Sequence, residues 1–265
     1  MNVLGYDPYW TDEKQRRFQW RHFAEIRKAG FDFVRVNLHS FKHMDEANRL
    51  NPEWLRKLDD IVLEAQKAGL SVILDEHDFN DCANDLDLCR TKLTAFWSQV
   101  APRYASAPNS VAFELLNEPN GRLTAQAWNA LAPKVLAAVR ATNPDRVVMI
   151  GPVEWNSVHE LKHLRLPADR NLIVSIHSYD PFDFTHQGVA HLAVPALTVM
   201  RPASTDSSTP SGAQLHTDVI VPAVDMERTR WKRCDPRPGA PGAVNELVVT
   251  QALDARSNVN PRNVR

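Results

Sequence analysis

The chain contains 265 residues, 43% hydrophobic and 24% charged, which is enough for one large domain or two small ones with a substantial core. Its 31 basic and 32 acidic side chains give a formal net charge of −1, so no global field favours nucleic acid or an anionic membrane as a partner. No apolar run approaches the ~18 residues of a membrane-spanning helix. Residues 1–20 include four acidic or basic positions before the Arg16-Arg17 pair and lack the apolar centre of a signal peptide. We therefore expect a soluble chain without a membrane span.

Cysteines and acidic residues do not predict a metal or cofactor. Cys82, Cys89 and Cys234 are too few and too scattered for a disulfide framework or a four-ligand zinc site. Segment 78–89 contains several aspartates beside two of these cysteines, but their spacing matches no metal-ligand pattern. We expect this segment to be a solvated loop, and we expect no cofactor.

The first half of the chain repeats a helix followed by a strand. Apolar residues at helical spacing predict a helix over 11–29, which Gly30 ends, and residues 31–38 follow as a strand. Asn51 is the expected cap of a second helix, which Gly69 ends before a strand over 71–75. The repeated Lys-Ala-Gly at the end of both helices supports a repeated unit.

The same alternation continues to about residue 176. Predicted helices at 93–104 and 128–139 precede strands at 111–116 and 146–150, and a short helix at 159–164 precedes a strand at 171–176. The strands are continuous apolar runs, which are typical of a parallel sheet covered on both faces. This leaves two architectures, a doubly wound open sheet or an eightfold barrel.

Polar residues distinguish the two architectures. No glycine-rich phosphate loop follows the early strands, which disfavours a nucleotide-binding open sheet. Polar and catalytic-type residues instead gather where strands end, at 35–39, 76–78, 117–118, 154–156 and 177–179. Such convergence at the carboxyl ends of successive strands favours a (β/α)8 TIM barrel.

The composition changes after about residue 190. Of the 21 aromatic residues only Trp231 follows that point, whereas 8 of the 18 prolines do. We expect a partial barrel over 1–190 and an atypical tail over 191–265, disordered or out of frame, with a hint of regular structure only at 218–224 and 246–253.

The strongest local motif is the strand 113–119, Phe-Glu-Leu-Leu-Asn-Glu-Pro, which places a carboxyl group and a neighbouring amide at the mouth of a barrel. It resembles the strand-4 signature of glycoside hydrolase family 5, the cellulase family. Segments 31–35, 72–77 and 171–179 are similar to that family's strands 2, 3 and 6, in the same order. The resemblance implies an incomplete (β/α)8 barrel in which strands 1–6 are recognisable and strands 7 and 8 are not.

The resemblance also implies a chemistry. Glu118 would be the general acid/base of a retaining hydrolase acting on β-1,4-linked polysaccharide, with a pKa raised to about 6 by burial and a neighbouring carboxylate. Asn117 would bind the sugar 2-hydroxyl. The other expected substrate-site residues are Arg35 and Tyr179, which would orient the nucleophile, His77 and His177 beside the cleaved bond, and Trp155 as a stacking platform. Glu114 and Glu154 match no catalytic position and are interpreted as structural.

The nucleophile of a retaining hydrolase is not identifiable. The motifs stop after about residue 188, before the stretch that should hold strand 7, and Glu246 is retained as a candidate only because apolar residues follow it. A shift of reading frame near 189–191 would explain the abrupt change, and translation of the other two frames tests it. The alternatives are a non-catalytic carbohydrate-binding protein and a truncated fragment. A chain without strands 7 and 8 is expected to be poorly soluble or partly molten and nearly inactive. We expect a monomer, and the family is usually secreted or periplasmic.

Overall fold

The computed structural model describes residues 2–3, 18–179 and 247–251. The helices are α2 (Arg21–Lys28), α3 (Pro52–Lys67), α4 (Phe79–Asn84), α5 (Leu86–Arg103), α6 (Ala125–Arg140) and α7 (Val153–Asn156), with 3-10 turns η1 (Phe41–His43) and η2 (Val158–His163). The strands are β1 (Asn2–Val3), β2 (Phe33–Leu38), β3 (Ser71–Glu76), β4 (Val111–Glu114), β5 (Val148–Ile150), β6 (Leu172–Ser178) and β7 (Leu247–Gln251).

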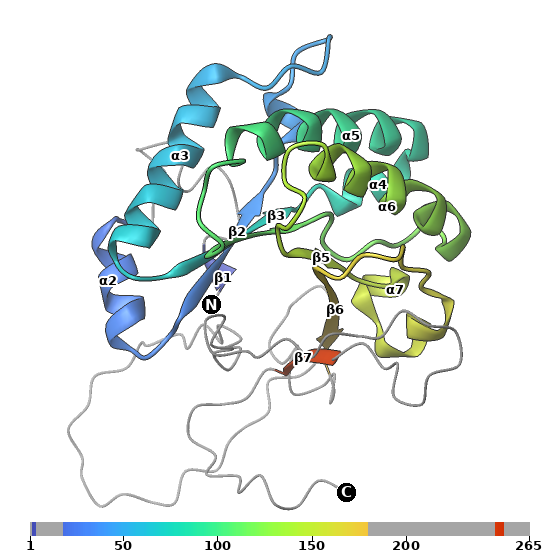
Figure 1. Cartoon of the computed structure of the whole chain (residues 1–265). Helices are drawn as coiled ribbons and strands as arrows, with labels where there is room; N and C mark the ends of the chain where they lie inside the picture. The colour runs from blue at the N-terminus through green and yellow to red at the C-terminus, as the bar shows by residue number, and fades with distance from the viewer. Residues whose placement is uncertain (1, 4–17, 180–246, 252–265) are drawn as a thin grey trace, which may run out of the picture.

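The strands form one parallel sheet of seven strands in the order β1 to β7. Figure 1 shows the helices arranged in an arc around the curved sheet. Among the described residues no strand pairing joins β7 to β1, so the sheet is an incomplete (β/α)8 barrel. The predicted fold class is confirmed.

Local signals in the sequence set the ends of several helices. The Asn51 side chain accepts hydrogen bonds from the backbone amides of Glu53 and Trp54 at 2.7 and 3.3 Å, which caps α3 as predicted. Gly69 follows that helix with φ of +76°, a conformation that glycine adopts without a steric penalty. The first predicted helix is observed as α2, and residues 4–17 lie outside the described residues.

Alternation along the strands separates two apolar clusters. The larger cluster lies between the sheet and the helices and includes Val34, Val36, Leu74 and Phe113. The smaller consists of residues on the opposite strand face, namely Phe33, Ile73, Ala112, Met149 and Ile173. Because successive side chains of a strand point to opposite faces, the smaller cluster lies inside the barrel and forms an apolar floor.

The predicted tail is described only in part. Strand β7 lies within segment 246–253, and Leu247 pairs with Val174 of β6. The rest of 191–265, with the predicted segment 218–224, lies outside the described residues.

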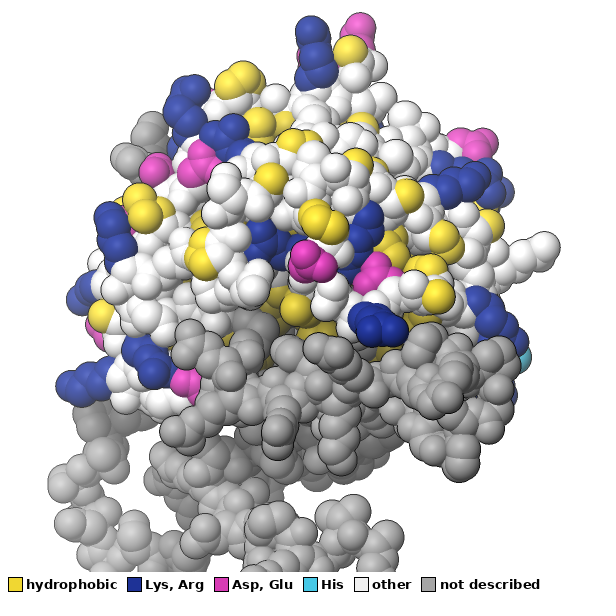
Figure 2. Space-filling model, viewed as in Figure 1, with side chains coloured by type: hydrophobic (Ala, Val, Ile, Leu, Met, Phe, Trp, Pro, Cys, Tyr) yellow, Lys and Arg dark blue, Asp and Glu magenta, His cyan; other side chains and the backbone are white. Residues whose placement is uncertain are grey.

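On the face shown in Figure 2, basic side chains are scattered among neutral and acidic ones. Within the part of the chain that the structure describes, no helix is long and apolar enough to cross a membrane.

Candidate active site

A layer of buried charges lies directly above the apolar floor. Arg35 of β2 donates from Nε to Oε2 of Glu114 at 2.6 Å, and its Nη1 lies 3.0 Å from Oδ2 of Asp75. The strand register explains the layer, because each of these residues stands two positions after a floor residue of the same strand. Burial alone would raise the pKa of Glu114, but the Arg35 guanidinium lowers it below its usual value. Glu114 is thus the structural partner of Arg35, in line with the interpretation of its sequence context.

The candidate acid/base, Glu118, follows the end of β4. Its backbone is left-handed with φ of 43°, and the residue is 9% exposed. Oε1 lies 2.6 Å from Nδ1 of His177 and accepts a hydrogen bond from the Tyr179 hydroxyl at 2.7 Å. Among the described residues Oε2 has no hydrogen-bond partner, so it is the oxygen available to a ligand.

The expected increase in the pKa of Glu118 is wrong for the described structure. Burial raises this pKa, but the contacts with His177 and Tyr179 outweigh burial and lower it below the usual glutamate value. The expectation assumed a neighbouring carboxylate that repels a second negative charge. The described residues place hydrogen-bond donors beside the carboxyl group instead, and these stabilise its ionised form.

Asn117 connects Glu118 to the charged layer. Its backbone amide donates to the carbonyl of Glu76 at 2.8 Å, and its Oδ1 accepts from Nη2 of Arg35 at 2.9 Å. Its Nδ2 lies 3.5 Å from Nε2 of His77. The amide is only 2% exposed and held on both sides, so its orientation is fixed before a ligand binds.

His77 is oriented by its own strand and by β2. Its Nδ1 lies 2.5 Å from Oδ2 of Asp75 and 3.0 Å from Nδ2 of Asn37. Burial and the Arg35 charge lower the pKa of His77 well below the usual value, which favours a neutral ring. Sequence reasoning included Asn37 only in the polar group 35–39 and gave it no role, although it stands two residues after Arg35 and therefore on the same face of β2.

Two aromatic side chains line the accessible part of this region. Trp155 is 50% exposed and Tyr179 is 41% exposed. The backbone amide of Trp155 donates to the carbonyl of Pro119 at 3.4 Å, which links its loop to the residue after Glu118.

Arg35 and Tyr179 were expected to orient a nucleophile, but their contacts described here go to Glu114, Asp75, Asn117 and Glu118. The six predicted substrate-site residues nonetheless lie at one end of the sheet, where strands β2 to β6 end.

Another buried carboxyl group supports the loop after β2; sequence reasoning placed it in the polar group 76–78 but gave it no role. Glu76 is fully buried and accepts hydrogen bonds from the Ser40 hydroxyl and the Asp78 backbone amide, both at 3.0 Å. Asp78 in turn accepts from the backbone amide of Phe41 at 2.7 Å. Burial and the nearby Asp78 carboxylate raise the pKa of Glu76 well above its usual value. Only the alternation of the strand could have indicated a buried side chain at this position.

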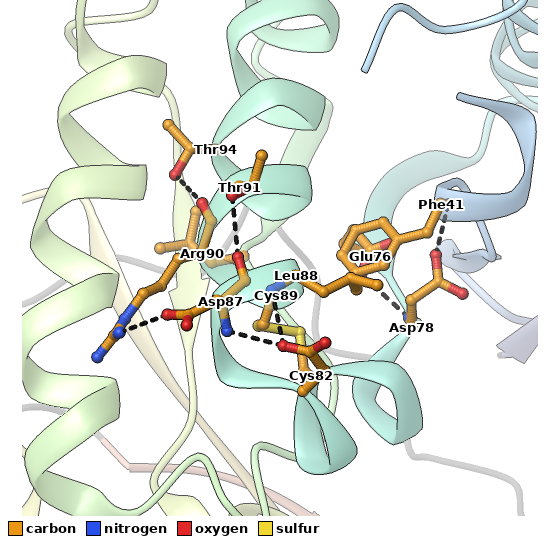
Figure 3. The surroundings of a disulfide bond; sticks show 12 residues. Phe41, Glu76, Asp78, Cys82, Asp87, Leu88, Cys89, Arg90, Thr91 and Thr94 are labelled. Carbon is orange, nitrogen blue, oxygen red and sulfur yellow. Dashed lines mark hydrogen bonds and ion pairs between the residues drawn. A yellow bond between two sulfur atoms is a disulfide. The ribbon is translucent and has the colours of Figure 1, made fainter. Parts of the chain in front are cut away.

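The expected loop over 78–89 is wrong, and the segment contains a disulfide that sequence reasoning did not predict. Helices α4 and α5 occupy this segment, and a disulfide joins Cys82 to Cys89, both fully buried (Figure 3). Asp85 caps α5 by accepting from the amides of Asp87 and Leu88 at 3.0 Å. Of the aspartates that resembled a solvated loop, Asp85 is thus a helix cap and Asp81 and Asp87 are exposed helix residues, whereas Asp78 is buried. Cys234 lies outside the described residues.

Helix α4 contacts the loop that carries Glu118. The Arg122 amide donates to the carbonyl of Ala83 at 2.9 Å. Gly121 has φ of +61°, and a Cβ atom added there would lie 2.9 Å from Cβ of Ala83. The disulfide thus holds α4 to α5 on one side while α4 packs against the loop 117–122 on the other.

The candidate nucleophile Glu246 lies outside the described residues. Strand β7 begins with the next residue, Leu247, and its sequence Leu-Val-Val-Thr-Gln contains no carboxylate. Because β7 runs parallel to β6, His177 at the carboxyl end of β6 pairs with Thr250.

Comparison with known proteins places this arrangement in a family. The family model described as Cellulase (glycosyl hydrolase family 5) matches residues 2–218, which extends beyond residue 188, where the recognisable motifs stop. Endoglucanase H of Acetivibrio thermocellus is 28% identical over 168 residues, which cover 63% of this chain and 19% of that protein.

Two solved structures are similar over about two thirds of this chain. A hyperthermophilic endo-β-1,4-glucanase in complex with substrate has a TM-score of 0.64 and 36% identity, covering 68% of this chain and 58% of that one. Thermotoga maritima Cel5A in complex with mannotriose has a TM-score of 0.64 and 31% identity, covering 67% and 59%. The chain therefore spans less than two thirds of the length of each of these relatives.

Proposed function

The chain belongs to glycoside hydrolase family 5, the cellulase family, and we propose on this basis that it hydrolyses β-1,4-linked polysaccharide such as cellulose. The observation that carries the proposal is the environment of Glu118. This carboxyl group stands at the carboxyl end of a barrel strand, and Oε1 is held by His177 and Tyr179 while Oε2 is available to a ligand.

The proposed reaction is a retaining double displacement with Glu118 as the acid/base. The protonated carboxyl group donates its proton to the leaving glycosidic oxygen, and the carboxylate then removes a proton from the water that attacks the glycosyl-enzyme intermediate. The retaining route needs a second carboxylate about 5–5.5 Å from the first. Glu246 is the candidate that the sequence offers, and its carboxylate would also raise the pKa of Glu118 toward the value an acid needs.

The proposed substrate-binding role of each residue follows from where its side chain lies relative to Glu118. Trp155, half exposed, is proposed as a platform for a sugar ring, and Asn117 as the partner of the sugar 2-hydroxyl. His77 and His177 flank the cleaved bond in this proposal, and Arg35 keeps Asn117 oriented. The substrate is a glucan or a mannan, since one similar enzyme was solved with mannotriose and another is an endo-β-1,4-glucanase.

The test compares the full chain with Glu118→Gln, using cellotetraose and mannotetraose. We expect hydrolysis by the wild type and a loss of about 10²–10⁴-fold in Glu118→Gln, as is typical when a general acid/base is removed. Glu154→Gln is the matched control, because Glu154 is exposed and lies on the adjacent helix α7. Proton NMR of the fresh product, which should be the β-anomer, tests the retaining route.

A second candidate function is carbohydrate binding without turnover. It is favoured by the lowered pKa of Glu118, since a carboxyl group ionised at neutral pH is a poor proton donor. Calorimetric binding of cellotetraose by the wild type, with no product after prolonged incubation, would support this function over hydrolysis. Hydrolysis that Glu246→Gln abolishes would support the enzyme and identify its nucleophile.

A further inference from the structure

Asn156, at the end of α7, is a fully buried polar residue that the proposed chemistry does not yet use. Its backbone is left-handed with φ of 57°, and Glu154 and Trp155 before it have φ of 54° and 58°. Runs of left-handed non-glycine residues cost free energy and persist only where the surroundings enforce them. The backbone of this loop is thus strained, and in this conformation the Asn156 side chain is buried.

The position of the Asn156 amide is enforced by its neighbours. Its Nδ2 lies 3.4 Å from the Ser175 hydroxyl and 3.4 Å from Nε2 of His177. A Cβ atom added to Gly151 would lie 2.1 Å from Asn156 Oδ1, so only glycine leaves room for the amide there. The side chain therefore fills a site built for it.

His177 connects this amide to the acid/base candidate. While Nε2 faces Asn156, Nδ1 lies 2.6 Å from Oε1 of Glu118. The two ring nitrogens thus have different neighbours, an amide nitrogen on one side and a carboxylate oxygen on the other. An amide nitrogen only donates, so Nε2 must accept and the proton of a neutral ring must sit on Nδ1.

We propose that Asn156 is a positioning residue that selects the Nδ1–H tautomer of His177 and thereby confines the mobile proton of Glu118 to Oε2. The inference rests on the proposed function. In this tautomer His177 donates to Oε1 and, with Nδ1 already protonated, takes no proton from Glu118. Tyr179 donates to the same oxygen. Both hydrogen bonds stabilise Oε1 as an acceptor, so the proton given to the glycosidic oxygen and later taken from water moves at Oε2.

The other charged groups around His177 do not select which ring nitrogen carries the proton, so the tautomer depends on Asn156. Glu118 and Tyr179 face Nδ1, while Asp75 and Glu114 act on the ring electrostatically from β3 and β4, where Arg35 offsets their charge. On the Nε2 side the described neighbour is the uncharged amide. Asn156 Oδ1 has no hydrogen-bond partner in the part of the chain that the structure describes, so the described side-chain contacts of the amide are all made by Nδ2.

The test is nitrogen-15 NMR of the full chain with labelled histidine. The chain has ten histidines, and the ring signals of His177 are assigned by their loss in His177→Gln. We expect His177 of the wild type to carry its proton on Nδ1 with Nε2 unprotonated. A proton on Nε2 in the wild type would overturn the proposal without the need for any variant.

Asn156→Asp replaces the donor with an acceptor of the same shape, and we expect it to place a proton on Nε2. Asn109→Asp, which adds the same charge at an exposed loop position, should leave the His177 signals unchanged. An unchanged His177 spectrum in folded Asn156→Asp would also overturn the proposal.

Kinetics separate this inference from the proposed function. In an active wild type, Asn156→Asp should lower kcat at least tenfold with KM within twofold, and Asn109→Asp should change neither. If kcat were unchanged although the tautomer had changed, the catalytic part of the inference would be wrong. If the wild type hydrolyses none of the substrates, the proposed function fails while the NMR result still decides the tautomer.

Discussion

Removing the Arg35 side chain should destabilise the protein strongly and in a pH-dependent way. In Arg35→Met the carboxylates of Glu114 and Asp75 lose their common counter-charge, and both side chains are fully buried. Breaking a buried ion pair by removing one partner costs about 3–5 kcal/mol. This is a large part of the ~5–15 kcal/mol by which domains are usually stable.

The pH dependence follows from Glu114. In the wild type Arg35 lowers the pKa of Glu114, so the pair stabilises the folded state above the usual glutamate pKa, and this contribution disappears as the pH falls. In Arg35→Met the largest remaining influence on Glu114 is burial, which raises its pKa against the smaller effects of His177 and Ser175, so we expect the folded variant to bind a proton more readily than the wild type does. The cost of the substitution should therefore be largest at pH 7 and shrink toward pH 4.

Urea unfolding followed by tryptophan fluorescence at pH 7 and pH 4 measures this cost. The double variant Arg35→Met/Glu114→Gln should recover much of the lost stability at pH 7, since it removes the unpaired charge. The control is Arg49→Met, which breaks an exposed ion pair with Asp45 and should leave the unfolding midpoint nearly unchanged. The reasoning would be refuted if Arg35→Met cost no more than Arg49→Met, or cost the same at both pH values.

Three further changes test the loops around Glu118 and the accessible tryptophan. Gly121→Ala should lower the free energy of unfolding by about 1–3 kcal/mol, because the left-handed backbone disfavours alanine and the added Cβ meets Ala83; urea unfolding measures it. Reducing the Cys82–Cys89 disulfide should cost about 2–2.5 kcal/mol for a loop this short, measured as the difference in urea midpoint with and without reductant. Trp155→Ala should change stability by less than ~0.5 kcal/mol but weaken cellotetraose binding about tenfold in calorimetry.

Each of these changes has a control. Gly30→Ala introduces the same strain of positive φ, but its added Cβ would meet nothing within 4 Å, so it should cost less than the change at Gly121. Reductant should have no effect on Cys82→Ala/Cys89→Ala, whose midpoint should match that of the reduced wild type. Leu63→Ala removes an exposed apolar side chain from the outer helix α3 and should leave sugar binding unchanged. Equal effects of a change and its control would contradict the corresponding prediction.

Much of the barrel could be predicted from local features of the chain. Helix α3 begins after its asparagine cap and ends just before Gly69 because both signals act within a few residues of the backbone they stabilise. Strand β4, directly before Glu118, is a short run that parallel pairing buries on both faces. The grouping of Arg35, His77, Asn117 and His177 at one end of the sheet also follows from the sequence, because parallel strands bring their carboxyl ends together.

Other features depend on which residues meet across strands and loops, and no local pattern encodes that. Cys82 and Cys89 pair because α4 and α5 fold back on each other, although their spacing alone predicted nothing. The pKa of Glu118 is lowered, against expectation, because its nearest groups are the donors His177 and Tyr179. Composition and periodicity thus determined the kind of fold and the end of the sheet that carries the polar residues. Tertiary structure decided the charge and hydrogen bonding of each site residue, because electrostatic interactions depend on distances between groups far apart in the chain.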